Sequence, residues 1–188
     1  CSGVVRAARS RAPLPAAASA DRLVAATAPL EHVPFHPQRR HHCGPAALAT
    51  VLGASGVQAD PDVLADQVYV PGRRGSFQAE LVLAPRRAGR IPWVLDGSPV
   101  ALADELAAGR PVLVLQNLGI PAWPRWHYAV VIEAGPGGVT LRSGDRRRRR
   151  MSTRAFLRTW DWGERWALVA WRPGEGPARP EPRRWLQT

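Results

Sequence analysis

The stretch PQRRHHCGPAAL, residues 37–48, places Cys43 directly before a run of helix-forming residues. Residues 44–54 predict a helix, because Pro45 suits its first turn and Gly56 follows as a stop. A thiol at the start of a helix meets unpaired N–H groups and the positive end of the helix dipole, which favour the thiolate. The segment therefore predicts a cysteine nucleophile.

A thiolate nucleophile also needs a base and hydrogen-bond donors for the oxyanion. Gln38 can turn its side-chain amide toward the carbonyl under attack, and the backbone N–H of Cys43 supplies a second donor. Gly44 leaves room for a substrate backbone beside the sulfur. His127 begins an apolar strand after the loop 119–126, so we expect its imidazole at the rim of a sheet, facing the helix of Cys43. Together these residues indicate a cysteine–histidine pair.

The remaining pattern predicts helices first and strands after them. Further helices are expected over residues 61–68, 77–88 and 99–108, capped by Asp60, Ser76 and Ser98, with Pro85 kinking or splitting the second. Strands are expected over residues 91–95, 111–116, 126–133, 138–142 and 166–171, with a last helix after Ser152. This order predicts an α+β domain in which N-terminal helices pack on an antiparallel sheet.

The two ends of the chain differ in composition from its middle. Residues 1–30, rich in Ala, Arg, Pro and Ser, predict a flexible tether, and residues 173–188 predict a Pro- and Arg-rich tail. Residues 31–172 are expected to form one domain, long enough to bury a single sizeable core.

The first residues, CSG, resemble a bacterial lipoprotein after cleavage of its signal peptide. That resemblance implies a lipid on Cys1 and a location at the cell envelope, and an arbitrary chain boundary is the alternative. A disulfide between Cys1 and Cys43 is not expected, because Cys1 belongs to the predicted tether.

The formal net charge is +11, and all 26 basic residues are arginines. They are scattered, apart from the run at 146–150, and are not gathered with aromatic residues as nucleic-acid binding requires. We therefore expect no nucleic-acid partner. The run itself predicts a solvated hairpin extension, with contact to an acidic peptide or to lipid headgroups as the functional alternative. No stretch has the 18 or more apolar residues of a spanning helix.

The segment from Gln38 to CGPA at 43–46, the strand HYAVV at 127–131 and the helix after Met151 together resemble the bacteriocin-leader-processing, double-glycine peptidases. These form a papain-like family often fused to export transporters, and the likeness covers residues 34–172. The resemblance implies a papain-like fold and a Cys–His dyad steadied by an Asp or Asn. It also implies cleavage of a peptide or protein substrate after small residues such as Gly-Gly, without a cofactor.

The sequence departs from the family pattern at the third catalytic group. The family usually has an Asp on the strand after the His, whereas this chain has LRSGD at 141–145. Ser143 stands at the expected place and Asp145 two residues later. Asp145 is the candidate third residue, with Ser143 or a backbone carbonyl as alternatives. The spacing between Gln38 and Cys43 is also one residue shorter than the family pattern.

Three alternatives to a peptidase remain open. The first is a metal site: zinc prefers His and Cys ligands, and five of these residues are close in sequence, His32, His36, His41, His42 and Cys43. Their spacing matches no common zinc pattern, so no metal is expected. A non-catalytic papain-like module that binds a peptide or partner at the cell envelope is the second alternative, and the missing Asp favours it. An amine in place of water at the thioester would give a transferase. The oligomeric state stays open.

Overall fold

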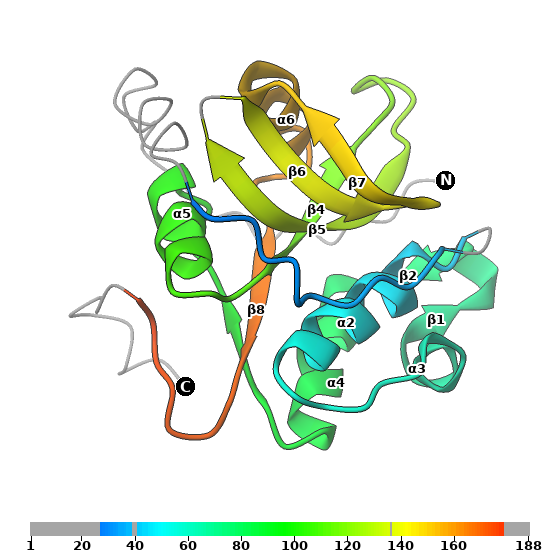
Figure 1. Cartoon of the computed structure of the whole chain (residues 1–188). Coiled ribbons are helices and arrows are strands. Elements are labelled where there is room, and N and C mark those ends of the chain that lie inside the picture. The colour runs from blue at the N-terminus through cyan, green and yellow to red at the C-terminus, as the bar shows by residue number, and fades with distance from the viewer. Residues whose placement is uncertain (1–26, 39–40, 136, 179–188) are drawn as a thin grey trace.

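The computed structural model describes residues 27–38, 41–135 and 137–178 (Figure 1). Its elements, in chain order, are α2 (Cys43–Ala54), α3 (Pro61–Val68), β1 (Tyr69–Val70), a 3-10 turn (Pro71–Arg73), β2 (Gly75–Ser76), α4 (Gln78–Arg87), β3 (Ile91–Val94), α5 (Pro99–Ala107), β4 (Val112–Asn117), β5 (Trp126–Gly135), β6 (Gly138–Ser143), β7 (Arg146–Met151), α6 (Thr153–Asp161) and β8 (Ala167–Trp171). The predicted α+β class is confirmed.

One antiparallel sheet of six strands organises the domain, in the order β3-β8-β4-β5-β6-β7. In Figure 1 the strands β4 to β7 curve over the top of the molecule, and α2, α3 and α4 gather below them at the lower right. Every residue of β4 and β8 is buried, which matches the continuous apolar runs PVLVLQ and WALVAW in the sequence.

Helix α2 is the central helix of the domain. Its residues 44–52 are all buried, so apolar or small side chains cover its whole circumference. It packs against α3 on one side and against β5 on another. Because Cys43 is the first residue of α2, this packing brings the thiol to the place where the helix meets β5.

Three of the predicted helix caps are confirmed. The side chains of Asp60, Ser98 and Ser152 accept hydrogen bonds from backbone N–H groups in the first turns of α3, α5 and α6, at 2.8, 3.0 and 3.3 Å. The cap predicted at Ser76 is wrong, because Ser76 lies in β2 and α4 begins at Gln78. The predicted split at Pro85 is also wrong: α4 continues through this buried proline, whose missing N–H removes a single helical hydrogen bond.

The arginine run at 146–150 forms strand β7, the second strand of a hairpin, which agrees with the predicted solvated hairpin extension. It pairs with β6 and lies at the end of the sheet order, where four of its five arginines are exposed. Charged side chains on an edge strand oppose pairing with other chains. Pairing with the buried strand β6 therefore decides the conformation of a segment that has no apolar alternation of its own.

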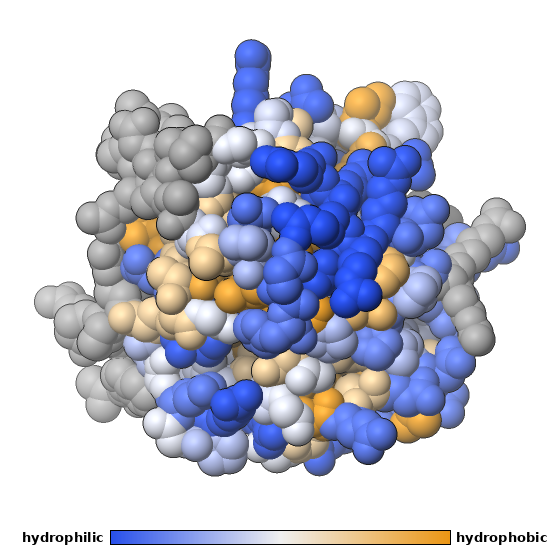
Figure 2. Space-filling model, viewed as in Figure 1, coloured by the Kyte–Doolittle hydropathy of each residue, from blue (hydrophilic) through white to orange (hydrophobic). Residues whose placement is uncertain are grey.

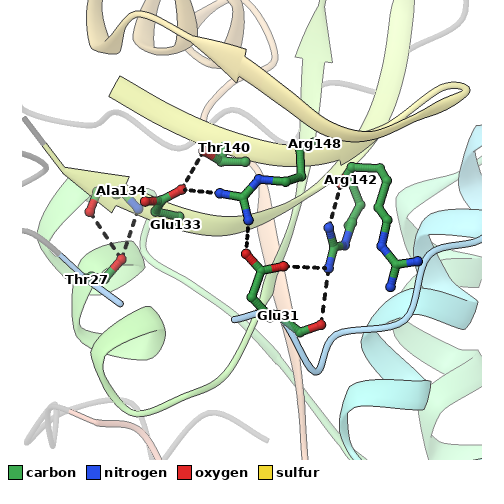
Figure 3. Close-up of polar contacts among 8 residues, drawn as sticks. Thr27, Glu31, Glu133, Ala134, Thr140, Arg142 and Arg148 are labelled. Atoms are coloured by element: carbon green, nitrogen blue, oxygen red, sulfur yellow. Dashed lines mark hydrogen bonds and ion pairs between the residues drawn. The ribbon is translucent and has the colours of Figure 1, made fainter. Parts of the chain in front are cut away.

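A segment before α2 lies along the sheet and is fixed to it by polar contacts (Figure 3). Thr27 exchanges backbone and side-chain hydrogen bonds with Ala134, and Leu30 N–H donates to Ile132 O at 3.0 Å. Arg148 on β7 pairs with Glu31, and with Glu133 at 3.4 Å. In the described part of the chain, four residues ahead of the predicted boundary at residue 31 thus already belong to the described structure, and Thr27 and Leu30 among them contact the sheet.

The guanidinium of Arg142 fixes the same segment from β6. This side chain is only 2% exposed and donates to Val33 O at 2.9 Å and to Arg147 O at 2.6 Å. It therefore holds the chain five residues before Gln38.

At the other end of the chain, Ala178 N–H donates to Glu105 of α5 at 3.0 Å, so part of the predicted tail contacts the domain. The rest of the predicted tether and tail, residues 1–26 and 179–188, lies outside the described residues. Within the described ranges no helix has the length and apolarity needed to cross a bilayer.

Candidate active site

Tyr128, the third residue of β5, joins two of the predicted site residues. The side-chain N–H of Gln38 donates to Tyr128 O at 3.2 Å. The backbone N–H of the same residue acts on the thiol of Cys43, whose pKa it lowers. His127 immediately precedes Tyr128. The structure thus places Cys43 and Gln38 beside the backbone of Tyr128, the residue that follows His127 in β5.

The imidazole of His127 is held by Ser143 on the neighbouring strand. Its Nε2 lies 2.8 Å from Ser143 Oγ, and Ser143 is only 3% exposed. Asp145 is exposed in the turn between β6 and β7. Of the alternatives for the third group, the structure thus brings Ser143 into hydrogen-bond contact with the ring. Nδ1 is the ring nitrogen left to exchange a proton with a thiol.

His127 is neutral at neutral pH. Burial, and after it the positive charges of Arg149 and Arg125, lower the pKa of His127 to about 4. Both arginines come from elements beside the ring: Arg125 ends the loop before β5, and Arg149 lies on β7. A cation near an imidazole disfavours its protonated form.

Cys43 is neutral in the same resting state. Burial raises the pKa of the Cys43 thiol, and the backbone N–H groups of Tyr128, Gly44 and Cys43 itself act in the opposite direction. Two of these N–H groups belong to α2, so the start of the helix does lower the pKa of the thiol, as predicted. Burial is nevertheless the larger effect. The predicted lowering of the thiol's pKa is therefore wrong for the resting protein.

Gly44 has a different role from the one predicted. A Cβ built on Gly44 would meet Ser76 Oγ at 2.3 Å and Ser76 Cβ at 2.7 Å, so the space beside the residue is filled by Ser76 and not left for a substrate. The hydroxyl of Ser76 is buried and has no hydrogen-bond partner among the described residues. Tyr128 also contacts Ser76, because its hydroxyl donates to Ser76 O at 3.2 Å.

Gln38 is fixed at both its backbone and its side chain. Its N–H donates to Gly144 O at 2.9 Å, which ties it to the turn that follows Ser143. One N–H of its amide is used by Tyr128 O, and a primary amide has two. The second N–H is therefore the one that could bind a substrate carbonyl.

The loop before β5 is closed by hydrogen bonds and presents aromatic side chains. Asn117 Oδ1 accepts hydrogen bonds from Gly119 N–H and Arg125 N–H, both at 2.9 Å, which closes the loop at its base. Ile120 and Trp123 form an isolated antiparallel bridge at its tip. Trp123 is 77% exposed and Trp126, next to His127, is 49% exposed.

The histidines considered as zinc ligands do not gather. In the described part of the chain, no three His, Cys, Asp or Glu side chains lie together as metal ligands would. The ring of His42 lies 4.8 Å from that of Tyr69, which is an aromatic contact. Cys43 is a free thiol, and Cys1 lies outside the described residues.

Sequence reasoning missed Tyr128, Ser76 and the two arginines that act on His127. A residue next to a candidate base carries a signal by adjacency alone, so Tyr128 could have been found. Ser76 and Arg149 could not, because their contacts depend on β2 and on a strand that the sequence pattern does not predict.

Comparisons with known proteins give a consistent picture of the fold. No protein-family model matches the chain, and no curated protein is similar to it in sequence. Three solved structures superimpose on most of it. The peptidase domain of Streptococcus ComA, a bifunctional ABC transporter involved in quorum sensing, has a TM-score of 0.61 and 22% identity over 75% of this chain and 99% of that domain.

The other two similar structures are also peptidases. A C39-like peptidase from Bacillus anthracis has a TM-score of 0.63 and 18% identity over 77% of this chain and 96% of its own length. A double glycine motif protease from an AMS/PCAT transporter, solved in complex with its leader peptide, has a TM-score of 0.56 and 18% identity over 73% of this chain and 90% of its own. The chain therefore has the α+β, papain-like fold of C39 peptidases.

Proposed function

We propose that this papain-like domain is a cysteine peptidase in which Cys43 is the nucleophile and His127 the proton acceptor and donor. The observation that carries the proposal is the meeting of Cys43 and Gln38 on the backbone of Tyr128, next to His127. A nucleophile, a base and an amide donor within one site match the requirements of acyl transfer. The shared fold with three peptidases supports the same conclusion.

The reaction begins from a neutral thiol and a neutral imidazole. As the sulfur of Cys43 attacks the peptide carbonyl carbon, Nδ1 of His127 takes the thiol proton. The C=O electron pair moves to oxygen, giving a tetrahedral oxyanion. The backbone N–H groups of Tyr128 and Gly44 stabilise negative charge on the sulfur during this transfer, because they already lower the pKa of the thiol.

The oxyanion is held by the second side-chain N–H of Gln38 and by the backbone N–H of Cys43. When the intermediate collapses, the C–N bond breaks and the imidazolium of His127 gives its proton to the leaving amine. The acyl group stays on Cys43 as a thioester. Water, deprotonated by His127, then hydrolyses the thioester, and the thiol is restored.

Ser143 is assigned the role of the third group, as a positioning residue. Its hydroxyl oxygen accepts the Nε2–H of His127, which leaves the lone pair on Nδ1 to receive the thiol proton. Unlike a carboxylate, it adds no negative charge to balance the imidazolium. Asp145 is exposed in the adjacent turn and serves as the comparison residue for this assignment.

Cleavage after small residues such as Gly-Gly is the proposed specificity. It is supported by fold-level analogy with the double glycine motif protease that was solved with its leader peptide.

A quenched-fluorescence peptide library, containing peptides with Gly-Gly, Ala-Ala and larger pairs before a central bond, tests the activity. The wild-type protein should cleave a subset of the peptides, and neither Cys43→Ala nor His127→Ala should cleave any above background. Arg87→Gln, on the exposed face of α4, serves as the matched surface control and should cleave as wild type does. Equal signals from wild type and Cys43→Ala would exclude the proposed reaction.

A non-catalytic peptide-binding module is the second candidate function. One observation favours it: both members of the dyad are neutral at rest, and the group bound to His127 is a hydroxyl, not a carboxylate. A binding module would retain peptides of the library without cleaving them. Equilibrium binding to the wild-type protein, measured beside the cleavage assay, separates the two functions.

A further inference from the structure

The direction of the proposed reaction assigns one side of the site to the leaving part of the substrate. His127 protonates the leaving amine, so the residues that follow the cleaved bond must lie next to its ring. Around His127 this surface is formed by the end of the loop before β5 and by the strands β6 and β7. The side chains on these elements are therefore the ones that meet the leaving peptide.

Arginines dominate that surface. Arg125 is exposed and stands two residues before His127. Across the sheet, Arg146 is paired in register with Ser143, the residue bonded to His127, and Arg149 is paired with Leu141. Figure 2 shows a strongly hydrophilic surface where β6 and β7 lie in Figure 1.

The arginines beside His127 differ from their neighbour Arg148. The guanidinium of Arg148 is paired with Glu31 and Glu133 (Figure 3). In the described part of the chain, neither Arg125 nor Arg149 has a carboxylate within salt-bridge distance. Their charges reach the imidazole, because after burial they are the causes that lower the pKa of His127. An anion bound beside these cations would reduce the cost of forming the imidazolium.

The loop that carries Arg125 is already fixed in place. Asn117 holds its base through two hydrogen bonds, and its neighbour Trp126 exposes an apolar ring. A binding surface that needs no ordering loses less free energy when a peptide binds. The loop thus holds the backbone of Arg125 in place two residues before the histidine that protonates the leaving amine.

We propose that Arg125 and Arg149 bind an acidic side chain of the substrate, located within the first few residues after the cleaved bond. This inference rests on the proposed function, since the mechanism decides which part of the substrate faces His127. The substrate class is then a peptide with small residues before the bond and Asp or Glu shortly after it.

Binding to the Cys43→Ala protein tests the inference without cleavage. The probes are a fluorescein-labelled peptide with Gly-Gly before the bond and two Glu among the first three residues after it, and its counterpart with two Gln. Exposed ion pairs have modest strength, so the Glu peptide should bind about fivefold more tightly at low salt, and the preference should shrink as salt is added.

Adding Arg125→Gln and Arg149→Gln to the Cys43→Ala protein should abolish its preference for the Glu peptide. Arg86→Gln/Arg87→Gln, on α4, removes the same net charge from another exposed place and should retain it. A peptide with the two Glu placed before the bond should bind no better than the Gln peptide. Equal binding of the Glu and Gln peptides would overturn the inference. So would a preference that survives the Arg125→Gln/Arg149→Gln change.

The wild-type protein separates this inference from the proposed function. Cleavage of both peptides at equal rates would overturn the acidic specificity and leave the peptidase standing. Selective binding of the Glu peptide without cleavage would overturn the peptidase and retain the arginine site. Binding to phosphatidylglycerol vesicles that depends on Arg125 and Arg149, with no discrimination between the peptides, would assign the surface to a membrane and overturn the inference.

Discussion

The Nε2 atom of His127 lies 2.8 Å from the hydroxyl oxygen of Ser143. A hydroxyl can fix the orientation and tautomer of the ring, but it does not balance a positive charge as a carboxylate would. Two arginines on the same side add to the cost of that charge. In the proposed cysteine–histidine dyad the imidazolium therefore has little electrostatic support, and this relationship can be tested from several directions.

Removing the hydroxyl should weaken catalysis by misplacing the ring. We expect Ser143→Ala to lower kcat by about tenfold to a hundredfold with little change in KM, because a poorly oriented base affects the chemical step. Asp145→Asn should change kcat by less than about twofold if Ser143 is the positioning residue. Steady-state kinetics on both variants, with a library substrate, checks the pair. A larger loss from Asp145→Asn than from Ser143→Ala would return the role to Asp145.

Replacing the hydroxyl by a carboxylate, in Ser143→Asp, should change the pKa of His127. A carboxylate beside Nε2 stabilises the imidazolium, so the pKa of His127 should rise toward its ordinary range. The acidic limb of the pH profile of kcat/KM should then move to higher pH. An unchanged limb would show that residue 143 does not contact the ring in the active protein.

Stability should depend on pH through His127. Its pKa is about 4 in the folded protein and about 6.5 in an unfolded chain, so the unfolded chain binds the proton more readily. The stability that depends on the neutral form of His127 is fully present above pH 6.5 and is lost as the pH falls toward 4. The free energy of unfolding falls by about 3 kcal/mol at most through this effect. Urea unfolding at pH 7 and pH 4.5 should show a smaller difference for His127→Asn than for wild type. Equal differences would place the imidazole in water.

The resting thiol should react slowly. Because burial raises the pKa of Cys43, iodoacetamide should alkylate it at pH 7 more slowly than it alkylates free cysteine, in a protein that carries Cys1→Ser. The rate should rise steeply only above the ordinary thiol pKa. Fast alkylation at pH 6 that disappears in His127→Ala would instead show a preformed thiolate–imidazolium pair. The neutral resting state would then be contradicted, and the dyad itself would not.

Gly44 and Ser76 should behave as a coupled pair. A Cβ at Gly44 would meet Ser76 Oγ at 2.3 Å, so Gly44→Ala should destabilise the protein by about 1–3 kcal/mol through overpacking. Ser76→Gly in the same protein removes the opposing atoms and should recover much of the loss. A double-mutant cycle by urea unfolding measures the coupling. Additive effects would mean that the two residues do not touch in solution.

Much of the fold could be predicted from local pattern. The buried runs that became β4 and β8 and the side-chain caps at Asp60 and Ser98 are signals that the chain carries within a few residues. Strand β7 could not be predicted in this way, because RRRRR has neither apolar alternation nor β-branched residues. Its conformation is decided by pairing with β6, which is a tertiary effect.

The candidate site could likewise be predicted only in part from the local sequence. Cys43, Gln38 and His127 could be singled out because a nucleophile, a donor and a base have recognisable residue types and positions. The choice between Ser143 and Asp145 could not be made, because it depends on which side chain a twisted hairpin turns toward β5. At Cys43 the backbone N–H groups of the helix start lower the pKa of the thiol and burial raises it. Which effect is larger could not be predicted from the sequence, since burial is a property of the packed domain.

The most direct test of the central claim is to trap the acyl group on Cys43. A p-nitroanilide of the sequence that precedes the bond in the best library substrate is mixed with Cys1→Ser protein, quenched in acid within seconds and analysed by mass spectrometry. The account predicts a thioester of the expected mass on the fragment that contains Cys43, and no adduct when His127→Ala is added. Release of p-nitroaniline with no adduct on Cys43, or release that persists in Cys43→Ala, would contradict it.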